Sequence, residues 1–280
     1  MIVVADSGAT KTDWRIIDKT NRVVNFETIG LSPYFNTESD FLSALTHNFP
    51  TGIDANSVRE VYFYGSGCGV QERGESVANY LQLFFSNAQV NAQSDALGAA
   101  RALFGNQPGI VIILGTGSNV TYYNGKSLEN RTPSLGYALG DEGSGAYMGR
   151  LLLRALLYGF LPKELSDKLA EKYNVQLSHI LNMTYTSPRP SAYLASFVPF
   201  LVENVNHPVI SDIVDEALNM MYKYHLSVFP NLQEIPVGVI GSVGCLFSDR
   251  LNVVASNNGF NVSHYLRYPI EHLVGYHSGS

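Results

Sequence analysis

The sequence is poor in cysteine, in charge and in long apolar runs, and each shortage excludes a class of protein. Only two cysteines occur in 280 residues, so a framework of disulfide bonds is not expected. Lysine and arginine total 18 against 24 acidic residues and no basic cluster is present, which argues against binding to nucleic acid or to an anionic membrane surface. The longest apolar run, residues 235–247, contains a proline and three glycines and falls short of the ~20 residues of a membrane span. The N-terminal apolar run is interrupted at Asp6 and is too short for a signal peptide, so we expect a cytoplasmic protein.

What is present is material for a substantial core, because 45% of the residues are hydrophobic and the length suits two domains. Strands are predicted at 2–5, 13–18, 22–29, 60–64 and 89–92, and helices at 38–48, 76–85 and 96–104. A meander followed by alternating strands and helices predicts α/β architecture. The breaker-rich segment 105–109 is the expected boundary, which gives domains at 1–105 and 106–280. The second domain is predicted to hold a hairpin, a buried helix at 144–160, a long helix with an apolar face over 210–228 and a strand at 237–240.

The stretch Asp6-Ser7-Gly8-Ala9-Thr10-Lys11-Thr12 lies between two short apolar segments and is predicted to form the tip of a β-hairpin. Gly8 is expected to turn with a positive φ and to leave its amide uncovered. Two threonine hydroxyls and the Lys11 cation suit an anion, and the Asp6 carboxylate suits a metal ion. An ordinary polar turn explains the same residues equally well.

A second copy of this pattern shifts the balance toward phosphate binding. The apolar segment 109–114 leads into Gly115-Thr116-Gly117-Ser118-Asn119 and out through a second strand. Two such hairpins about a hundred residues apart are predicted to grip one polyphosphate chain from opposite sides.

Five segments together resemble one protein family, in the family's order. Residues 6–12 resemble the phosphate-1 loop and residues 115–119 the phosphate-2 loop of the superfamily of sugar kinases, Hsp70 and actin. Residues 93–100 are similar to the segment that carries the catalytic aspartate, residues 139–144 match a further signature, and residues 239–244 resemble the adenosine motif. The chain therefore looks like a member of the BadF/BadG/BcrA/BcrD-type ATPase family, in its N-acetylglucosamine kinase branch.

The resemblance implies two ribonuclease-H-like lobes, as in actin-like ATPases, with a cleft between them. The N-terminal lobe would carry the phosphate-1 loop, and the C-terminal lobe the phosphate-2 loop, a helical insertion and the adenosine motif. The implied ligands are ATP and Mg²⁺, with Asp6 on the metal. The residues implied to bind the ATP phosphates are Gly8, Ala9, Thr10, Lys11, Thr12, Gly115, Thr116 and Gly117, and those implied to bind adenosine are Gly241, Ser242, Val243 and Gly244.

Four polar residues are implied to act on the acceptor sugar. Asp95 would be the general base, because phosphoryl transfer to an alcohol needs a carboxylate beside the attacking hydroxyl. Its position before a helix also fits a simple N-cap. Ser118, Asn119 and Asp141 would bind the sugar, since such side chains donate and accept hydrogen bonds at fixed angles. Helix capping for Asp141 and a turn role for Asn119 remain alternatives.

Two departures from the family pattern concern the identity of the sugar. A sugar-binding asparagine is replaced by Tyr34, with Asn36 nearby, and an expected aromatic residue is replaced by Leu135. The implied reaction is the phosphorylation of N-acetylglucosamine to its 6-phosphate, with N-acetylmuramic acid or another amino sugar as alternatives. The seven histidines show no zinc-binding spacing and are read as ordinary surface or core residues.

A rival function within the same family is an ATPase that activates a dehydratase. Such proteins hold an iron–sulfur cluster across a dimer, and two cysteines satisfy the count. Cys68 and Cys245 are too far apart for a local cluster motif, which argues against this function. A homodimer is a possible assembly in either case.

Overall fold

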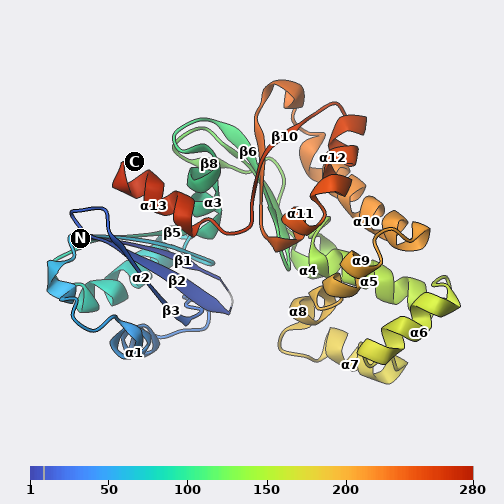
Figure 1. Ribbon diagram of the computed structural model, residues 1–280, viewed down its shortest axis with the longest axis horizontal. Coiled ribbons are helices and arrows are strands. Elements are labelled where there is room, and N and C mark those ends of the chain that lie inside the picture. Colours follow the sequence, from blue (N-terminus) through green and yellow to red (C-terminus); the bar gives the residue numbers. More distant parts are fainter. Residues whose placement is uncertain (9, 280) are drawn as a thin grey trace. The chain divides into compact units, whose positions relative to one another are not determined.

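The computed structural model describes residues 1–8 and 10–279 of the chain (Figure 1). The chain forms two compact units. Unit 1 consists of Met1–Gln107, Asn124–Leu128 and Tyr268–Ser280, and unit 2 of Pro108–Tyr123 and Glu129–Arg267. Among the helices of the described residues, none combines the length and the apolar character that crossing a membrane requires.

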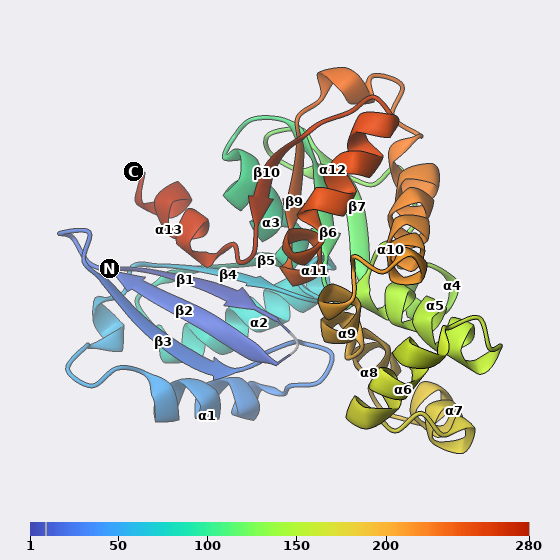
Figure 2. The ribbon, with the colours of Figure 1, turned by 45° about the vertical axis from the view of Figure 1, so that its right-hand side comes forward.

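Unit 1 contains a five-stranded sheet in the order β3-β2-β1-β4-β5 (Figure 2). The first three strands form an antiparallel meander, and β4 and β5 run parallel to β1. Its strands are β1 (Ile2–Ser7), β2 (Lys11–Ile17), β3 (Val23–Ile29), β4 (Glu60–Gly65) and β5 (Gln89–Ser94). All five strands were expected from the sequence, and the α/β class is confirmed.

Side chains alternate between the two faces of this sheet. On one face, Val3 and Ala5 pack in a core with Trp14 and with residues of α1 (Glu38–Asn48) and α2 (Gln71–Phe84). The Trp14 ring stacks on Phe26 with centroids 5.5 Å apart. The opposite face is covered by α3 (Asp95–Phe104) and α13 (Ile270–Ser278), so Asp6 lies on this second face.

The C-terminal helix α13 belongs to unit 1, although it was expected in the C-terminal lobe at 106–280. It contacts α3, β1 and β2, and buries Ile270 and Leu273 there. His277 stacks on Tyr62 with ring centroids 3.7 Å apart, and its Nε2 lies 2.8 Å from the hydroxyl of Tyr64. These contacts fix the last helix on a sheet that is made from the first third of the chain.

Unit 2 repeats the sheet of unit 1. Its order is β10-β9-β6-β7-β8, with β6 and β7 antiparallel and with β9 and β10 parallel to β6. Its strands are β6 (Gly109–Leu114), β7 (Ser118–Tyr123), β8 (Leu128–Glu129), β9 (Val237–Ile240) and β10 (Val262–Leu266). Within each unit the order is therefore third, second, first, fourth, fifth strand.

The helical insertion of unit 2 lies between β8 and β9, and two more helices follow β9. The helices are α4 (Gly136–Leu139), α5 (Gly145–Leu157), α6 (Lys163–Lys172), α7 (Leu177–Tyr185), α8 (Pro190–Ala195), α9 (Val198–Glu203), α10 (Pro208–Met221), α11 (Ser242–Leu246) and α12 (Ser248–Asn257). Helix α5 buries seven of its first nine residues. Gly149 allows close packing there, because a Cβ would lie 1.9 Å from the carbonyl oxygen of Leu194 in α8. Its expected C-terminal extension is exposed at Tyr158 and Phe160 instead.

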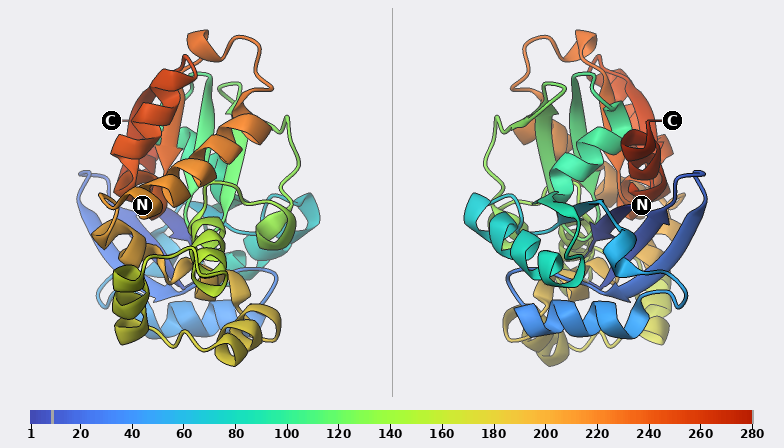
Figure 3. Two further views of the ribbon diagram at one scale, coloured as in Figure 1. Left: turned by 90° about the vertical axis from the view of Figure 1, so that its right-hand side faces the viewer. Right: turned by 90° about the vertical axis from the view of Figure 1, so that its left-hand side faces the viewer.

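The predicted long helix over 210–228 is α10, shown in orange along one face of the sheet in Figure 3. Its buried stripe matches the predicted apolar face, apart from Val228, which is exposed. Residues Tyr222–Leu226 continue it as a single π-helical turn. Such turns insert an extra residue and occur frequently at functional sites.

Candidate active site

The turn between β1 and β2 closes on itself. Strands β1 and β2 pair up to Ser7 and Thr12, as expected for a hairpin. The amide of Gly8 donates to the carbonyl oxygen of Lys11 at 3.0 Å, and φ of Gly8 is not left-handed. The expected positive φ and uncovered amide are therefore wrong. Ala9, expected to bind phosphate, lies outside the described residues. Thr10 is exposed.

Two buried hydroxyls, those of Ser7 and Thr12, stabilise the base of this turn by hydrogen bonds. Ser7 Oγ lies 2.7 Å from Thr12 Oγ1 and donates to the carbonyl oxygen of Leu31 at 2.7 Å. The amide of Leu31 donates back to Ser7 Oγ at 3.0 Å. Thr12 is completely buried, and its hydroxyl donates to the carbonyl oxygen of Ile29. The Thr12 hydroxyl therefore shapes the turn, which differs from the expectation that it contacts a phosphate.

Lys11 points to carboxylates of its own sheet. Its Nζ lies 3.0 Å from Asp13 Oδ1 and 2.9 Å from Glu27 Oε1, and hydrogen bonds to Glu27 and Asp13 raise its pKa. The lysine side chain is 48% exposed, and exposed ion pairs contribute at most ~1 kcal/mol. The contact with Glu27, whose side chain is 60% exposed, can therefore be exchanged at little cost, whereas the Asp13 side chain is only 13% exposed and would lose its cation.

Two carboxylates, Asp6 and Asp13, lie next to this turn, and Asp95 is near enough to influence the pKa of Asp6. Asp13, which the sequence analysis missed, stands directly opposite Asp6 in the β1–β2 ladder. Burial raises the pKa of Asp6 to about 7, and the charges of Asp95 and Asp13 add to the rise, against a small opposing effect of Lys11. No group of three or more potential metal ligands lies together in residues 1–8 and 10–279. One or two carboxylates with several waters are nevertheless the usual protein share of a Mg²⁺ site.

Asp95 begins α3 at the end of β5. The N-cap is Ser94, whose Oγ accepts from the amide of Leu97 at 3.1 Å, so capping does not explain Asp95. The Asp95 carboxylate accepts from the amide of Ala96 at 2.9 Å. Desolvation by the surrounding protein raises its pKa, against backbone hydrogen bonds that lower it. The residue is nevertheless exposed to solvent in this structure, so water and a substrate hydroxyl can reach it.

The turn between β6 and β7 is fixed by the start of α5. The amide of Gly115 donates to the carbonyl oxygen of Gly117 at 3.0 Å. The amides of Gly145 and Ala146 donate to the carbonyl oxygens of Gly115 and Thr116 at 2.9 and 3.0 Å. The turn is therefore rigidly placed before any ligand binds.

The three expected sugar-binding residues come together in unit 2. Ser118, Asn119 and Asp141 line one small cavity of about 10 Å³, which is room for about one water molecule. The Asp141 carboxylate accepts from the backbone amide of Ser118, and burial raises its pKa. A Cβ on Gly117 would lie 2.9 Å from Asp141 Oδ2, so a glycine is needed for this approach.

Asp141 has a left-handed backbone, with φ of 57°. This conformation is uncommon for residues other than glycine and costs of order 1 kcal/mol or more. His225, read from the sequence as an ordinary histidine, also lines the cavity. Its position on a turn more than eighty residues from Asp141 left no local signal in the sequence.

Residues 241–244, which were expected to bind adenosine, begin against the turn between β6 and β7. Gly241 has φ of 117°, and a Cβ there would lie 2.3 Å from the carbonyl oxygen of Leu114, the last residue of β6. Ser242, Val243 and Gly244 form the start of α11. Beside this helix is a cavity of about 350 Å³, lined by Val205, Asn206, Ser211, Leu246, Phe247, Asp249, Arg250 and Val253. Pockets for small ligands start at about 300 Å³.

The two positions that depart from the family pattern both have defined surroundings. Asn36 Oδ1 accepts from the amide of Ser32 at 2.9 Å, so its side-chain oxygen closes a local turn. Tyr34 is half exposed, and the guanidinium of Arg73 lies 4.2 Å from its ring centroid. Leu135 is exposed and lines the cavity of Ser118 and Asp141.

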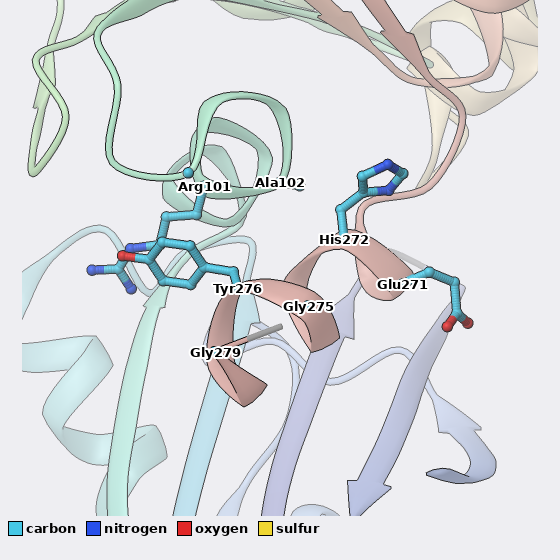
Figure 4. Close-up of a pocket in the computed structure, with 8 residues that line it drawn as sticks. Arg101, Ala102, Glu271, His272, Gly275, Tyr276 and Gly279 are labelled. Atoms are coloured by element: carbon cyan, nitrogen blue, oxygen red, sulfur yellow. The ribbon is translucent and has the colours of Figure 1, made fainter. Parts of the chain in front are cut away.

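A cavity of unit 1 contains none of the expected site residues. It measures about 600 Å³ and lies between α3 and α13, where Arg101 and Tyr276 line one side and Glu271 and His272 the other (Figure 4). Arg101 follows Asp95 by six residues, about 9 Å along the helix axis. The volume of a cavity alone therefore does not identify the functional site.

Comparison with known proteins identifies the family of the chain. No family model and no curated protein matches the sequence. Among solved structures, a Porphyromonas gingivalis protein is 33% identical, with a TM-score of 0.92 over 100% of this chain and 99% of its own. A Chromobacterium violaceum protein is 19% identical, with a TM-score of 0.72 over 98% and 97%. Both are named as putative N-acetylglucosamine kinases.

A more distant match shows the shared fold alone. A ROK family glucokinase from Streptomyces griseus, solved with glucose and AMPPNP, is 16% identical and has a TM-score of 0.59 over 100% of this chain and 98% of its own. The two repeated sheets thus form the two-lobed fold of actin-like ATPases. Since the identity to the Porphyromonas gingivalis protein extends over the whole chain, the chain belongs to the family of sugar kinases with this fold.

Proposed function

We propose that the chain transfers the γ-phosphoryl group of ATP to an amino sugar, and that N-acetylglucosamine, converted to its 6-phosphate, is the substrate. The observation that carries this proposal is the hydrogen bond from the Ser118 amide to Asp141, which joins a polar pocket to the phosphate-2 turn. The name of the Porphyromonas gingivalis relative, a putative N-acetylglucosamine kinase, supports the choice of sugar. We also propose that the chain belongs to the N-acetylglucosamine kinase branch of the BadF-type ATPases, on the resemblance of its five sequence segments.

Unit 2 would bind both substrates. The turn of Gly115, Thr116 and Gly117 would hold the phosphates, and the cavity beside α11 would take the adenine ring. Ser118, Asn119 and Asp141 would hydrogen-bond the sugar hydroxyls. The apolar side chains of Val120 and Leu135 in the same lining would suit the methyl of an acetamido group.

Unit 1 would supply the chemistry. Asp95 would accept the proton of the attacking hydroxyl as its oxygen bonds to the γ-phosphorus, while the bond to the β-phosphate oxygen breaks and ADP leaves. Thr10 and Lys11 would contact the phosphates. A Mg²⁺ ion held by Asp6, directly or through water, would neutralise the phosphate charge.

The alternative of a dehydratase activator is not favoured by the cysteines. Cys68 lies in unit 1 and is buried, and burial raises the pKa of its thiol to about 12. Cys245 lies in unit 2, and burial raises the pKa of its thiol too. Cluster ligands are thiolates, so these sites suit an iron–sulfur cluster poorly. N-acetylmuramic acid and other amino sugars remain alternative substrates of the same site.

An ADP-release assay over a panel of amino sugars tests the proposal. We expect Mg²⁺-dependent ADP release with N-acetylglucosamine, and a sugar phosphate identified by mass spectrometry and ³¹P NMR. The Asp95→Asn variant controls for contaminating kinases. Release of ADP with no phosphosugar for any member of the panel would contradict the proposal.

A further inference from the structure

Three side chains of unit 2 form a continuous hydrogen-bonded chain. His225 Nε2 lies 3.1 Å from Glu142 Oε2, and His225 Nδ1 lies 2.7 Å from Thr132 Oγ1. The histidine and glutamate side chains are only 16% and 12% exposed. We call these three residues the Thr-His-Glu chain.

The partners of the imidazole decide how its protons are arranged. An ionised Glu142 carboxylate can only accept, so Nε2 must carry a proton and donate it. In the neutral ring Nδ1 is then an acceptor, and the Thr132 hydroxyl must donate to it. His225 therefore orients both neighbours.

The Thr-His-Glu chain connects three of the four segments that line the small cavity, and residues 118–120 are the fourth. Thr132 starts the lining segment 132–135, Glu142 follows Asp141, and His225 lies on the π-helical turn after α10. Glu142 is held by His225 and shares a peptide bond with Asp141, whose backbone is left-handed, so an anchored Glu142 limits how far the backbone of Asp141 can move. Anchoring Glu142 thus also restrains the carboxylate expected to bind the sugar.

The cavity is too small for a sugar as it stands, at about 10 Å³. Pro133, Ser134 and Leu135 are exposed, whereas Thr132 is half buried and hydrogen-bonded. Room for a sugar can therefore come from outward movement of residues 133–135 while Thr132 stays in place.

We propose that His225 is a positioning residue of the sugar site: it anchors Thr132 as the pivot of the lining segment and holds Glu142 so that Asp141 faces the sugar. This inference rests on the proposed kinase function. It assigns His225 to sugar affinity, and not to ATP binding or to the chemical step.

Steady-state kinetics of matched variants test the assignment. His225→Ala removes two hydrogen bonds, each worth ~0.5–1.5 kcal/mol, so the KM for the sugar should rise about 10- to 100-fold. Thr132→Val removes one and should raise it about 3- to 10-fold, whereas Thr132→Ser should restore it. The kcat and the KM for ATP should change less than about twofold. His272→Ala, an exposed histidine of unit 1, is the control. Equal changes in both KM values, or no change in the KM for the sugar, would overturn the assignment.

Hydrogen–deuterium exchange separates this inference from the proposed function, because it needs no substrate. In His225→Ala, and to a smaller extent in Thr132→Val, residues 131–142 should exchange at least about tenfold faster, while α12 should be unchanged. Unchanged exchange over 131–142 would overturn the role of His225 even if the enzyme is active. A wild-type protein that phosphorylates no amino sugar, but shows the exchange effect, would contradict the proposed function and leave the anchoring role supported.

Discussion

Units 1 and 2 have the same strand order but different chemistry at the turn after their first strand. In unit 1 the turn is held by the buried hydroxyls of Ser7 and Thr12, and carboxylates surround it. In unit 2 the turn is held by amides of α5, and it leads into Ser118, Asn119 and one carboxylate, Asp141. The shared sheet therefore fixes where a turn lies, and the side chains added to it decide what the turn does.

The same contrast extends to the helices. Unit 1 covers its sheet with four helices, whereas unit 2 inserts seven between β8 and β9 in the described part of the chain. Two connecting segments of this insertion reach the cavity. The loop before α4 carries Thr132, and the turn after α10 carries His225. We infer that unit 1 supplies proton transfer and metal binding and that unit 2 supplies recognition.

The largest effect is expected for Asp95→Asn in unit 1. The amide cannot take the proton of the hydroxyl, so kcat should fall by ~10²–10⁴ while the KM for the sugar changes little. Steady-state kinetics with N-acetylglucosamine measure both constants. A variant with normal kcat would remove Asp95 from the mechanism and break the assignment of the chemistry to unit 1.

Asp141→Asn in unit 2 should act on recognition instead. Replacing a charged hydrogen-bond acceptor costs ~1.5–3 kcal/mol, so kcat/KM for the sugar should fall about 10- to 100-fold, chiefly through KM. The KM for ATP serves as the internal control. A fall in kcat with an unchanged KM for the sugar would contradict the assignment of Asp141 to recognition and of Asp95 to proton transfer.

Asp6→Asn should stabilise unit 1 at alkaline pH. The pKa of Asp6 is about 7 in the folded protein, whereas the ordinary value of an aspartate is 3.8. The folded protein therefore loses stability as pH rises from about 4 to 7 and the unfolded chain ionises more readily. Without Mg²⁺, we expect the free energy of unfolding of the variant to exceed that of the wild type by about 1–2 kcal/mol at pH 8 and to equal it at pH 4. Denaturant titrations at both pH values measure this. If Asp6 binds the metal, added Mg²⁺ should stabilise the wild type more than the variant.

His277→Gln should have the smallest effect. The variant should lose less stability than the wild type when the pH is lowered. Burial lowers the pKa of His277 to about 4, and the positive charge of Arg101 adds to this, so the native protein resists protonation. The wild type should therefore lose stability as pH falls from about 6.5 to 4, and the variant should lose about 1 kcal/mol less over that range. Thermal unfolding at pH 7 and pH 4.5 tests the difference. An identical pH dependence would show that α13 does not hold a neutral imidazole.

The sequence predicted the frame of the molecule better than its contacts. Short apolar segments on either side of turn residues located both hairpins, and the strand at 237–240 was found with the observed bounds. Strand β10 and helix α13 escaped prediction, because Val262–Leu266 lacks alternation and the return of α13 to unit 1 is a tertiary event.

Within the site, local patterns identified residues but not their partners. Ser118, Asn119 and Asp141 were expected together, and the structure brings them to one cavity. The burial of Thr12, the position of Asp13 opposite Asp6 and the Thr-His-Glu chain all depend on pairing across strands or over long separations in sequence. No window of neighbouring residues contains that information.

The placement of α13 has a consequence for how the protein is made. The strands of unit 1 emerge first from the ribosome, yet the face that carries Val4 and Asp6 gains its second covering helix only after residues 268–279 have been synthesised. Unit 2 has all its strands by residue 266. The half of the molecule that starts first is therefore completed last, and until then its exposed apolar surface is open to chaperones and proteases.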